Sequence, residues 1–501
     1  MTNHGGKVFL VGAGPGDPGL LTVRGAECLA RADVVLYDYL ASPLLLRHTA
    51  PHAELVCLGR HGGRLMSQEE VSRLMVEHAA AGKLVVRLKG GDPGIFGRVA
   101  EEATELNSAG IPFEIVPGIT TAIAAGSYAG VTLTDRDHAS CVAFVTGREQ
   151  AGKDAADGLD YAALAKFPGT LVFYMGVTTA PHWSQALIDG GKQGDTPVAM
   201  VRCCSLPTQE QWTCRLDEVA ELLAPAKVRP PVVVIVGPVV AHEKLARWFT
   251  SRPLFGKTVL VTRAEHQADT MANRLEDLGA AVLRQPAIEI TPPDDWAPVD
   301  TAIDELDEYD WLVFSSRNGV THFLDRIREQ GLDWRALGGV KLGAIGPATA
   351  EALAERDLQV DLKPTEYRAE ALAAELAPNA RGQRFLLLRA SRGREVLAET
   401  LREAGGVVDQ VVVYNSADVT QSDSHTASLL ADGKIDWITV TSSAIARSLV
   451  GIFGDALRKS KLAAISPLTA GVLDELGHST AAVADEYTID GVVDAILAAR
   501  L

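Results

Sequence analysis

The sequence lacks the features that mark several classes of protein. Its six cysteines all lie at or before position 214 and none forms a C-x-x-C pair. We therefore expect reduced, structural thiols and neither a disulfide framework nor a zinc site or other resident metal. No apolar run approaches the ~20 residues that cross a bilayer, and the opening MTNHGGK lacks a signal-peptide pattern. These absences favour a cytoplasmic protein without membrane contact.

An excess of positive charge is also missing, because the formal net charge is −17. A general nucleic-acid binder needs a basic face, so nucleic acid is not an expected partner. An anionic substrate would need a locally basic cleft, and the run RLKGGDP (87–93) offers such a cluster. What is present is an ordinary globular mixture, 47% hydrophobic and 22% charged over 501 residues. That length predicts two to four domains.

A domain boundary is expected near FTSRPLFGKTVLVTRA (249–264), where Pro253 and Gly256 precede a new apolar strand. We expect an N-terminal domain over 1–252, with lobes at about 7–118 and 119–250, and a C-terminal domain over 256–501. Apolar strands such as KVFLVG, DVVLYD and LVVRLK alternate with amphipathic stretches such as SQEEVSRLMVEHAAAG. This alternation predicts an α/β fold with parallel or mixed sheets covered by helices.

The second half contains an internal repeat. LGAIGPATAEALAERD and EYRAEALAAEL begin at 342 and 366, and their counterparts LAAISPLTAGVLDELG and EYTIDGVVDAIL begin 120 residues later, at 462 and 486. FSSRNGVTHFLDRI (314–327) likewise matches TSSAIARSLVGIF (441–453). We expect duplicated parallel-sheet units, lobe one at about 256–291 plus 417–501 and lobe two at about 292–416.

Hydroxyl and amide side chains follow the strands of both repeats. Polar groups at the carboxyl ends of parallel strands line a crevice, and a cleft between two lobes is a common ligand site. The candidate substrate-binding residues are Ser315, Ser316, Asn318, Ser442, Ser443 and Thr469. Arg389, Arg392 and Arg394 add a basic strand end, for which a solvated helix start is an equally good interpretation.

The first half opens with VFLVGAGPGDPGLLTVRGAECL (8–29), which begins like a dinucleotide site. A dinucleotide fingerprint needs G-x-G-x-x-G, whereas here Gly12, Gly14 and Gly16 alternate and Asp17 follows. That carboxylate would repel a pyrophosphate at the helix N-terminus. The glycines still allow a ligand to approach the backbone, so we expect a ligand other than a dinucleotide.

Other candidate residues lie directly after apolar strands. They are Asp38, Gly90-Gly91-Asp92, Thr120-Thr121 and Met175. Each has an ordinary interpretation taken alone: a turn or capping carboxylate, a tight turn and a packed methionine. Several strand-end loops that carry such residues in one domain favour a single shared site.

The motifs VGAGPGDPGLLT, ADVVLYD, VVRLKGGDPGIFGR, IPFEIVPGIT, SYAGVTLT and LVFYMGV occur in this order. As a set, over about residues 7–249, they resemble the uroporphyrinogen III C-methyltransferases of the tetrapyrrole methylase family. The resemblance implies a two-lobed fold, a homodimer, and two methyl transfers from S-adenosylmethionine to pyrrole carbons, giving precorrin-2 for sirohaem or cobalamin synthesis. Asp38 matches the family's proposed base. The matches to cofactor contacts are Pro15, Gly90, Gly91, Asp92, Ile95, Thr120, Thr121, Met175, Cys204 and Gly237.

The first half departs from the family pattern at several of these positions. Arg60 stands where the family has lysine; an arginine does not easily donate a proton but still attracts carboxylates. Cys203-Cys204 replaces a glycine near the cofactor, Asp135 replaces a histidine, and Val99-Ala100 replaces two glycines. Each change adds bulk or alters charge near the implied cleft.

The second half resembles uroporphyrinogen III synthase over about residues 256–501. The resemblance rests on VLVTRAEHQADTMANRLEDLGA, FSSRNGV, AIGPATAEAL, RGREVLAETLREAGGVVDQVVVYN and TSSAIA. It implies cyclisation of hydroxymethylbilane with loss of water and inversion of the last pyrrole ring. Tyr414 matches the tyrosine proposed to assist departure of the hydroxyl, and Thr469 matches a second implicated position. Ser466 stands where the family more often has glycine, and Asn415 where arginine is common.

Two other functions are compatible with the sequence. The second half could be a non-catalytic tetrapyrrole-sensing module, because a fold does not determine an activity. The first half could be an S-adenosylmethionine-dependent methylase that acts on a later corrin intermediate. Against these stands the reading of both halves as one bifunctional enzyme, in which the product of the second half is the substrate of the first.

Overall fold

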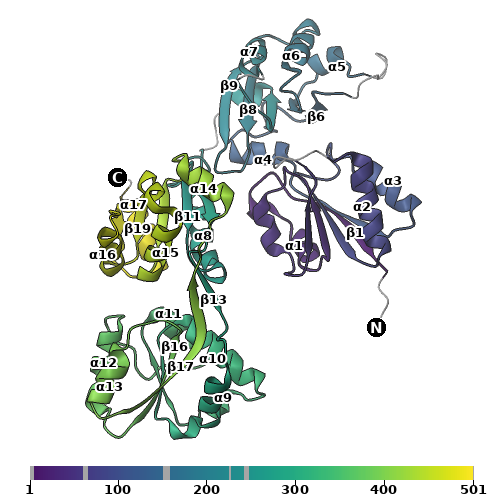
Figure 1. Ribbon diagram of the computed structural model, residues 1–501. Helices are drawn as coiled ribbons and strands as arrows, with labels where there is room; N and C mark the ends of the chain where they lie inside the picture. Colours follow the sequence, from purple (N-terminus) through teal and green to yellow (C-terminus); the bar gives the residue numbers. More distant parts are fainter. Residues whose placement is uncertain (1–4, 60–65, 150–157, 225–226, 242–246, 500–501) are drawn as a thin grey trace. The chain divides into compact units, whose positions relative to one another are not determined.

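The structure is a computed structural model that describes residues 5–59, 66–149, 158–224, 227–241 and 247–499. The chain forms two compact units. The first comprises the residues up to Lys257 together with Glu276–Ala281, and the second comprises Thr258–Leu275 and the residues from Val282 onward. Each unit is built on two five-stranded sheets covered by helices (Figure 1).

The first sheet has the strand order β3-β2-β4-β1-β5 and is parallel throughout. Its elements are β1 (Lys7–Gly12), α1 (Val23–Ala30), β2 (Val34–Tyr37), β3 (Glu54–Cys57), α2 (Gln68–Ala80), β4 (Leu84–Lys89), α3 (Val99–Ser108), β5 (Phe113–Val116) and, after it, α4 (Thr121–Tyr128). Both faces are buried: Phe9 and Val11 pack toward α1, whereas Val8 and Leu10 pack toward α2 and α3. Continuous apolar strands are expected of a sheet covered on both sides.

The second sheet of this unit is mixed, in the order β6-β7-β10-β8-β9. It contains β6 (Val142–Thr146), α5 (Tyr161–Ala165), β7 (Thr170–Tyr174), α6 (Ala180–Asp189), β8 (Pro197–Arg202), β9 (Glu210–Arg215), α7 (Val219–Leu222) and β10 (Val232–Val236). β6 and β7 are parallel, and the other pairs are antiparallel. β9 was not anticipated, because it is a half-exposed edge strand without the apolar run of the others.

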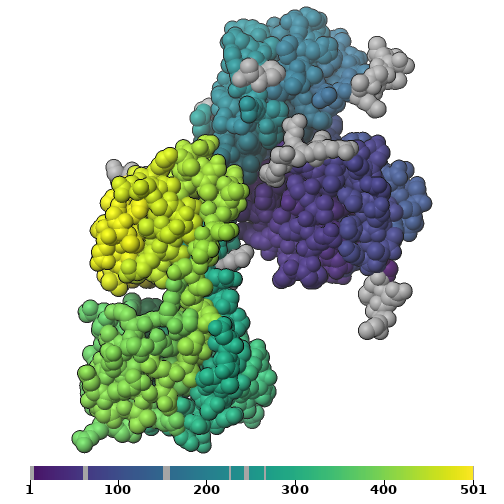
Figure 2. All heavy atoms as spheres, in the orientation of Figure 1, coloured from purple at the N-terminus to yellow at the C-terminus, as the bar shows by residue number. Residues whose placement is uncertain are grey.

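In the second unit the chain crosses between two lobes. One sheet, in the order β12-β11-β18-β19-β20, takes strands from both ends of the unit, and the other, in the order β13-β17-β16-β14-β15, takes the residues between them. The yellow C-terminal residues and the green residues near 300–400 accordingly lie in separate bodies in Figure 2. Both sheets are parallel except for the β13–β17 pair among the pairings described.

The first lobe of this unit contains β11 (Thr258–Val261), α8 (Glu265–Asp277), β12 (Ala281–Arg284), α14 (Ser424–Ala431), β18 (Trp437–Val440), α15 (Ser443–Phe453), β19 (Lys461–Ala464), α16 (Pro467–Glu475), β20 (Ala482–Val483) and α17 (Ile489–Ala498). The second contains β13 (Ile288–Thr291), α9 (Ala297–Asp304), β14 (Trp311–Phe314), α10 (Arg317–Glu329), β15 (Lys341–Ala344), α11 (Pro347–Ala354), α12 (Ala369–Leu376), β16 (Arg384–Ala390), α13 (Val396–Glu403) and β17 (Val407–Asp418).

One strand lies on a different sheet from the one expected. Residues 288–291 were expected in lobe one, but they form β13, which pairs antiparallel with the end of β17. β17 has 12 residues and extends past its parallel neighbour β16. The backbone N–H and C=O groups of its last residues, beyond the end of β16, need hydrogen-bond partners, and β13 supplies them.

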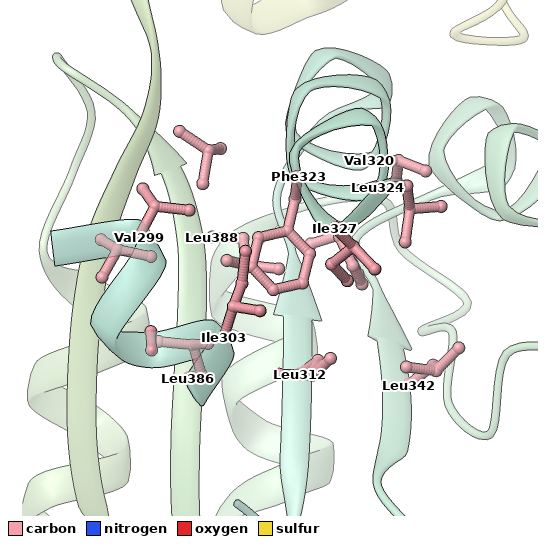
Figure 3. Packing of buried hydrophobic residues seen from close by; sticks show 14 of the residues in the cluster. Val299, Ile303, Leu312, Val320, Phe323, Leu324, Ile327, Leu342, Leu386 and Leu388 are labelled. Carbon is pink, nitrogen blue, oxygen red and sulfur yellow. The ribbon is translucent and has the colours of Figure 1, made fainter. Parts of the chain in front are cut away.

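The core of the second lobe shows how the repeated pattern folds. Phe323, Leu324 and Ile327 on one face of α10 pack onto Leu312 of β14 and Leu386 and Leu388 of β16 (Figure 3). The helix is fixed at its start by Ser316, whose Oγ accepts a hydrogen bond from the backbone N–H of Gly319. In the other repeat Ser442 caps α15 in the same way through Ile445. Each of the two strand endings thus supplies one serine as a helix cap.

Membrane-spanning helices were not expected, and in the described part of the chain no helix combines the length and the apolar character needed to cross a bilayer.

Candidate active sites

Three glycine backbones meet at the carboxyl edge of the first sheet. A Cβ built on Gly118 would lie 2.3 Å from the carbonyl oxygen of Gly91 and 2.7 Å from the Cα of Gly12. Gly91, whose φ is +69°, also exchanges two backbone hydrogen bonds with Gly14. No side chain fits between the loops after β1, β4 and β5, so these loops form a cradle of bare backbone.

Asp92 ties this cradle together. Its Oδ1 accepts a hydrogen bond of 2.8 Å from the backbone N–H of Gly94, and its Oδ2 accepts one of 2.9 Å from that of Gly118. Both oxygens are therefore engaged with the protein. These bonds hold the loops after β4 and β5 together, and the implied contact of Asp92 with the cofactor stays a prediction.

The loop that opens the chain is anchored to the loop after β8. The backbone N–H of Asp17 donates to Ser205 Oγ at 3.0 Å, and its carboxylate accepts from Tyr128 Oη at 2.7 Å. Pro15 is half-buried in the same loop. Cys204 is only 3% exposed, and burial raises the pKa of its thiol to about 12. This residue contributes an uncharged, packed side chain.

The remaining implied cofactor residues lie in the loops after β4, β5, β7 and β10. Ile95 follows Asp92, with its N–H bonded to the Asp92 carbonyl, and Gly90 packs against Leu40. Thr120 is buried just before α4, which begins at Thr121. Met175 directly follows β7 with φ +54° and a half-exposed side chain, so it is not the packed core residue of the ordinary interpretation. Gly237 follows β10 with φ +151°.

Asp38 lies at the same edge, at the end of β2, above a buried ionic network. Arg87 Nη2 donates to Asp38 Oδ1 at 2.6 Å, and Arg87 Nε donates to Glu102 Oε1 at 3.2 Å. Lys89 Nζ reaches the same Glu102 oxygen at 2.7 Å. Burial, and then the charge of Arg87, lower the pKa of Lys89. Asp38 itself keeps 31% of its side chain exposed, so it can meet a ligand while Arg87 holds it.

The network corrects one expectation. The run RLKGGDP was expected to provide a basic surface for an anionic substrate, but Arg87 and Lys89 are only 4% and 3% exposed. Both form ion pairs with Glu102, which is fully buried. Arg60, the implied second catalytic residue, lies outside the residues that the structure describes.

In the second unit the site forms around Tyr414, on β17. Its hydroxyl lies 2.9 Å from Ser316 Oγ, and its ring stacks on His322 at a centroid distance of 5.8 Å. Burial raises the pKa of Tyr414, against hydrogen bonds from Ser316 and Asn318 and the charge of Arg392. The phenol therefore keeps its proton at neutral pH and can donate it.

A cavity opens beside this tyrosine at the carboxyl ends of β14 and β16. Its wall includes Ser315, Arg389, Arg392, Arg394 and Tyr414. Ser315 Oγ donates to the backbone carbonyl of Leu388 at 3.1 Å. Each arginine has an acidic partner: Glu395, Asp418 and Glu370, respectively. The basic strand end anticipated from the sequence thus borders a cavity and is not merely a solvated helix start.

The other implied substrate residues divide between the two lobes. Asn318 Oδ1 accepts a hydrogen bond of 2.5 Å from Gln267 of α8, which joins the lobes at this point. Ser442, Ser443 and Thr469 lie in lobe one, where Ser442 caps a helix and Thr469 is 2% exposed with its hydroxyl 3.2 Å from Ser466 Oγ. The structure places Ser315, Ser316 and Asn318 near Tyr414, and the other three on a different sheet.

Sequence reasoning missed three residues of these sites. Glu102 and the buried state of Arg87 had no sequence signal, because α3 approaches β4 only in the folded chain. Tyr174 was visible only as part of LVFYMG, yet its hydroxyl contacts the start of α4. The one sequence signal for Tyr174 was its place as an aromatic residue at the end of a predicted strand, directly before Met175.

Comparisons with known proteins agree with this two-part arrangement. Residues 7–220 match the family model of Tetrapyrrole (Corrin/Porphyrin) Methylases, and residues 269–494 match that of Uroporphyrinogen-III synthase HemD. A Uroporphyrinogen-III C-methyltransferase of Bacillus subtilis is 36% identical over 72% of this chain and 74% of its own length. The chain spans about half of a Siroheme synthase of Zymomonas mobilis, to which it is 48% identical over 248 residues.

One solved structure is a uroporphyrin-III C-methyltransferase from Thermus thermophilus complexed with S-adenyl homocysteine. It is 41% identical, covers 47% of this chain and 99% of its own, and has a TM-score of 0.40. The Porphyrin biosynthesis protein HemD of Ruminiclostridium josui is 32% identical over 494 residues, 98% of both chains. The chain therefore combines a tetrapyrrole methylase domain with a uroporphyrinogen-III synthase domain, and it belongs to the family of this HemD protein, which it matches over nearly its whole length.

Proposed function

We propose that this protein is a bifunctional enzyme of tetrapyrrole biosynthesis. Its second unit cyclises hydroxymethylbilane to uroporphyrinogen III, and its first unit methylates that product twice to give precorrin-2, for sirohaem or cobalamin synthesis. The observation that carries the proposal is the pairing, in one chain, of a bare-backbone cradle beside Asp38 with a cavity beside the buried Tyr414.

S-adenosylmethionine is the methyl donor, and as a sulfonium it supplies a methyl group that an electron-rich carbon can attack. The residues present fit such a molecule. The cradle lets backbone approach closely, because a Cβ on Gly12 or Gly118 would collide with neighbouring backbone, and Met175 presents an exposed apolar side chain. Because the porphyrinogen carbon is itself the nucleophile, placement of the two reactants contributes much of the rate.

After each methyl transfer the substrate must lose a proton, which requires a base. We assign this role to Asp38, because its carboxylate is partly exposed at the cradle edge and is oriented by Arg87. Arg60 is assigned to attraction of the substrate's carboxylates rather than to proton donation.

In the second unit Tyr414 donates a proton to the departing hydroxyl of hydroxymethylbilane. Its burial keeps the phenol protonated, and Ser316 orients the hydroxyl. Ser315, Asn318, Ser442, Ser443 and Thr469 are proposed to line the path of the substrate from the two lobes. Helix caps and backbone N–H groups at those positions suit carboxylates.

We also propose that the enzyme is a cytoplasmic homodimer joined through its first unit, as the resemblance to C-methyltransferases implies. Light scattering of the purified protein should return twice the monomer mass of 53.2 kDa. A monomeric mass at micromolar concentration would overturn this part of the proposal.

The activities can be tested separately in the full-length protein. With uroporphyrinogen III and S-adenosylmethionine, without air, we expect precorrin-2; Asp38→Asn should suppress it and leave the synthase intact. With hydroxymethylbilane alone, we expect the type III isomer rather than the type I isomer of the uncatalysed cyclisation. Normal methylation without type III product would leave the second unit as a tetrapyrrole-binding module.

A further inference from the structure

Tyr174, the last residue of β7, contacts three of the loops that carry implied cofactor residues. Its hydroxyl lies 2.6 Å from Thr120 Oγ1 and accepts a hydrogen bond of 2.8 Å from the backbone N–H of Ala122. Thr120 ends the loop after β5, and Ala122 belongs to the first turn of α4. A side chain of the second sheet is thereby attached to the strand-end loop of the first.

The backbone N–H of Ala122 can only donate to the Tyr174 hydroxyl, whereas either hydroxyl can be the donor in the bond between Tyr174 and Thr120. A phenol has one proton to donate, and the oxygen of Tyr174 already accepts from Ala122. The arrangement that uses every group has Tyr174 donate its proton to Thr120 Oγ1. In that arrangement the proton of Thr120 is not needed by Tyr174 and remains for another acceptor. Tyr174 therefore sets which way the Thr120 hydroxyl presents its proton.

The aromatic ring of Tyr174 supports the third loop. Phe96, the residue after Ile95, lies over it with ring centroids 5.2 Å apart, although Phe96 has a φ of +53°. A positive φ is costly for a bulky side chain and needs packing to maintain it. Met175, the residue directly after Tyr174, also has a positive φ, at +54°. One strained residue therefore packs on the ring of Tyr174, and the other is its neighbour in the chain.

We propose that Tyr174 is a positioning residue of the methyltransferase site: through its hydroxyl it orients Thr120 and α4, and through its ring it holds the loop of Ile95 and Phe96. The inference rests on the proposed function, because it takes Ile95, Thr120 and Met175 as cofactor contacts. It adds a residue that touches none of the reacting atoms but determines the shape of the cofactor's binding surface.

The test is binding of S-adenosylhomocysteine to the full-length protein, measured by titration calorimetry. Tyr174→Phe removes only the hydroxyl and leaves the ring, so we expect about tenfold weaker binding, or ~1.4 kcal/mol. Tyr309→Phe is the matched control, because it removes a hydroxyl that bonds Asp409 at 3.1 Å in the other unit. It should bind S-adenosylhomocysteine as the wild type does.

A double-mutant cycle separates positioning from a general loss of structure. If Tyr174 acts through Thr120, then combining Tyr174→Phe with Thr120→Val should weaken binding scarcely more than Thr120→Val alone. Unchanged binding by Tyr174→Phe, or additive effects in the double variant, would overturn the inference. Failure of the wild type to bind S-adenosylhomocysteine would instead refute the proposed function. The thermal unfolding midpoint of the first unit reports that each variant of Tyr174 or Thr120 is folded, because synthase activity resides in the other unit.

Discussion

Replacing Glu102 should destabilise the first unit far more than replacing a carboxylate with the same number of basic partners at the surface. Glu102 Oε1 accepts hydrogen bonds from Lys89 at 2.7 Å, Gln68 at 3.1 Å and Arg87 at 3.2 Å, and the side chain is fully buried. Glu114 also joins two cations, Lys7 and Arg24, but 31% of its side chain is exposed. The two residues lie in the same lobe and form a matched pair.

The expected magnitude follows from burial. In Glu102→Gln the two cations, each at most 5% exposed in its side chain, retain only the Asp38 carboxylate between them. Removing one partner of a buried ion pair costs about 3–5 kcal/mol, and we expect the lower end because burial already lowers the pKa of Lys89, which can lose its proton. Glu114→Gln breaks exposed pairs, worth about 0–1 kcal/mol.

Thermal inactivation of the methyltransferase, with the synthase activity as an internal reference, measures both effects in one chain. For a unit of this size about 1 kcal/mol corresponds to roughly 2–4 °C in Tm, so Glu102→Gln should lower the midpoint by about 6–12 °C and Glu114→Gln by less than about 4 °C. Equal shifts in the two variants would refute the claim that Glu102 neutralises a buried pair of cations.

Three further predictions concern the sites directly. Gly118→Ala places a Cβ 2.3 Å from the Gly91 carbonyl oxygen and should abolish S-adenosylhomocysteine binding in calorimetry while type III synthesis persists; retained binding would contradict the cradle. Burial raises the pKa of Cys204 to about 12, so its thiol stays protonated as the pH rises through about 9, where ordinary thiols ionise. Iodoacetamide at that pH should spare it in the native protein, as judged by peptide mass spectrometry, and native labelling would count against its burial. Tyr414→Phe should slow type III formation roughly 100-fold, the usual contribution of a general acid, and leave methylation of supplied uroporphyrinogen III unchanged; an unaltered isomer ratio and rate would remove Tyr414 from the mechanism.

The features that could be predicted from the sequence are those for which the residue type alone determines the local structure. Gly12, Gly91 and Gly118 are recognisable because backbone contact at strand ends admits no side chain. The α/β class follows from strand–helix alternation, and the four helix-covered sheets agree with it. The duplicated serines were visible as a pattern, but their role as helix caps needed the backbone.

What the sequence could not show depends on which elements pack together. Arg87 and Lys89 alternate on β4 and resemble a basic surface, but α3 brings Glu102 beneath them and buries all three. β13 could not be assigned to its sheet, because only the overshoot of β17 creates the edge that it pairs with. The hydrogen bonds of Asp92 to Gly94 and Gly118 likewise depend on how two loops pack together.

One measurement tests the bifunctional assignment most directly: the mass and isomer type of the products that the purified full-length protein forms from hydroxymethylbilane and S-adenosylmethionine without air. A dimethylated product with the type III arrangement is the predicted result, because it requires cyclisation in the second unit and methylation in the first. A product with the type I arrangement, methylated or not, would contradict the assignment of the second unit as a synthase. Unmethylated uroporphyrinogen III would contradict that of the first unit as a methyltransferase.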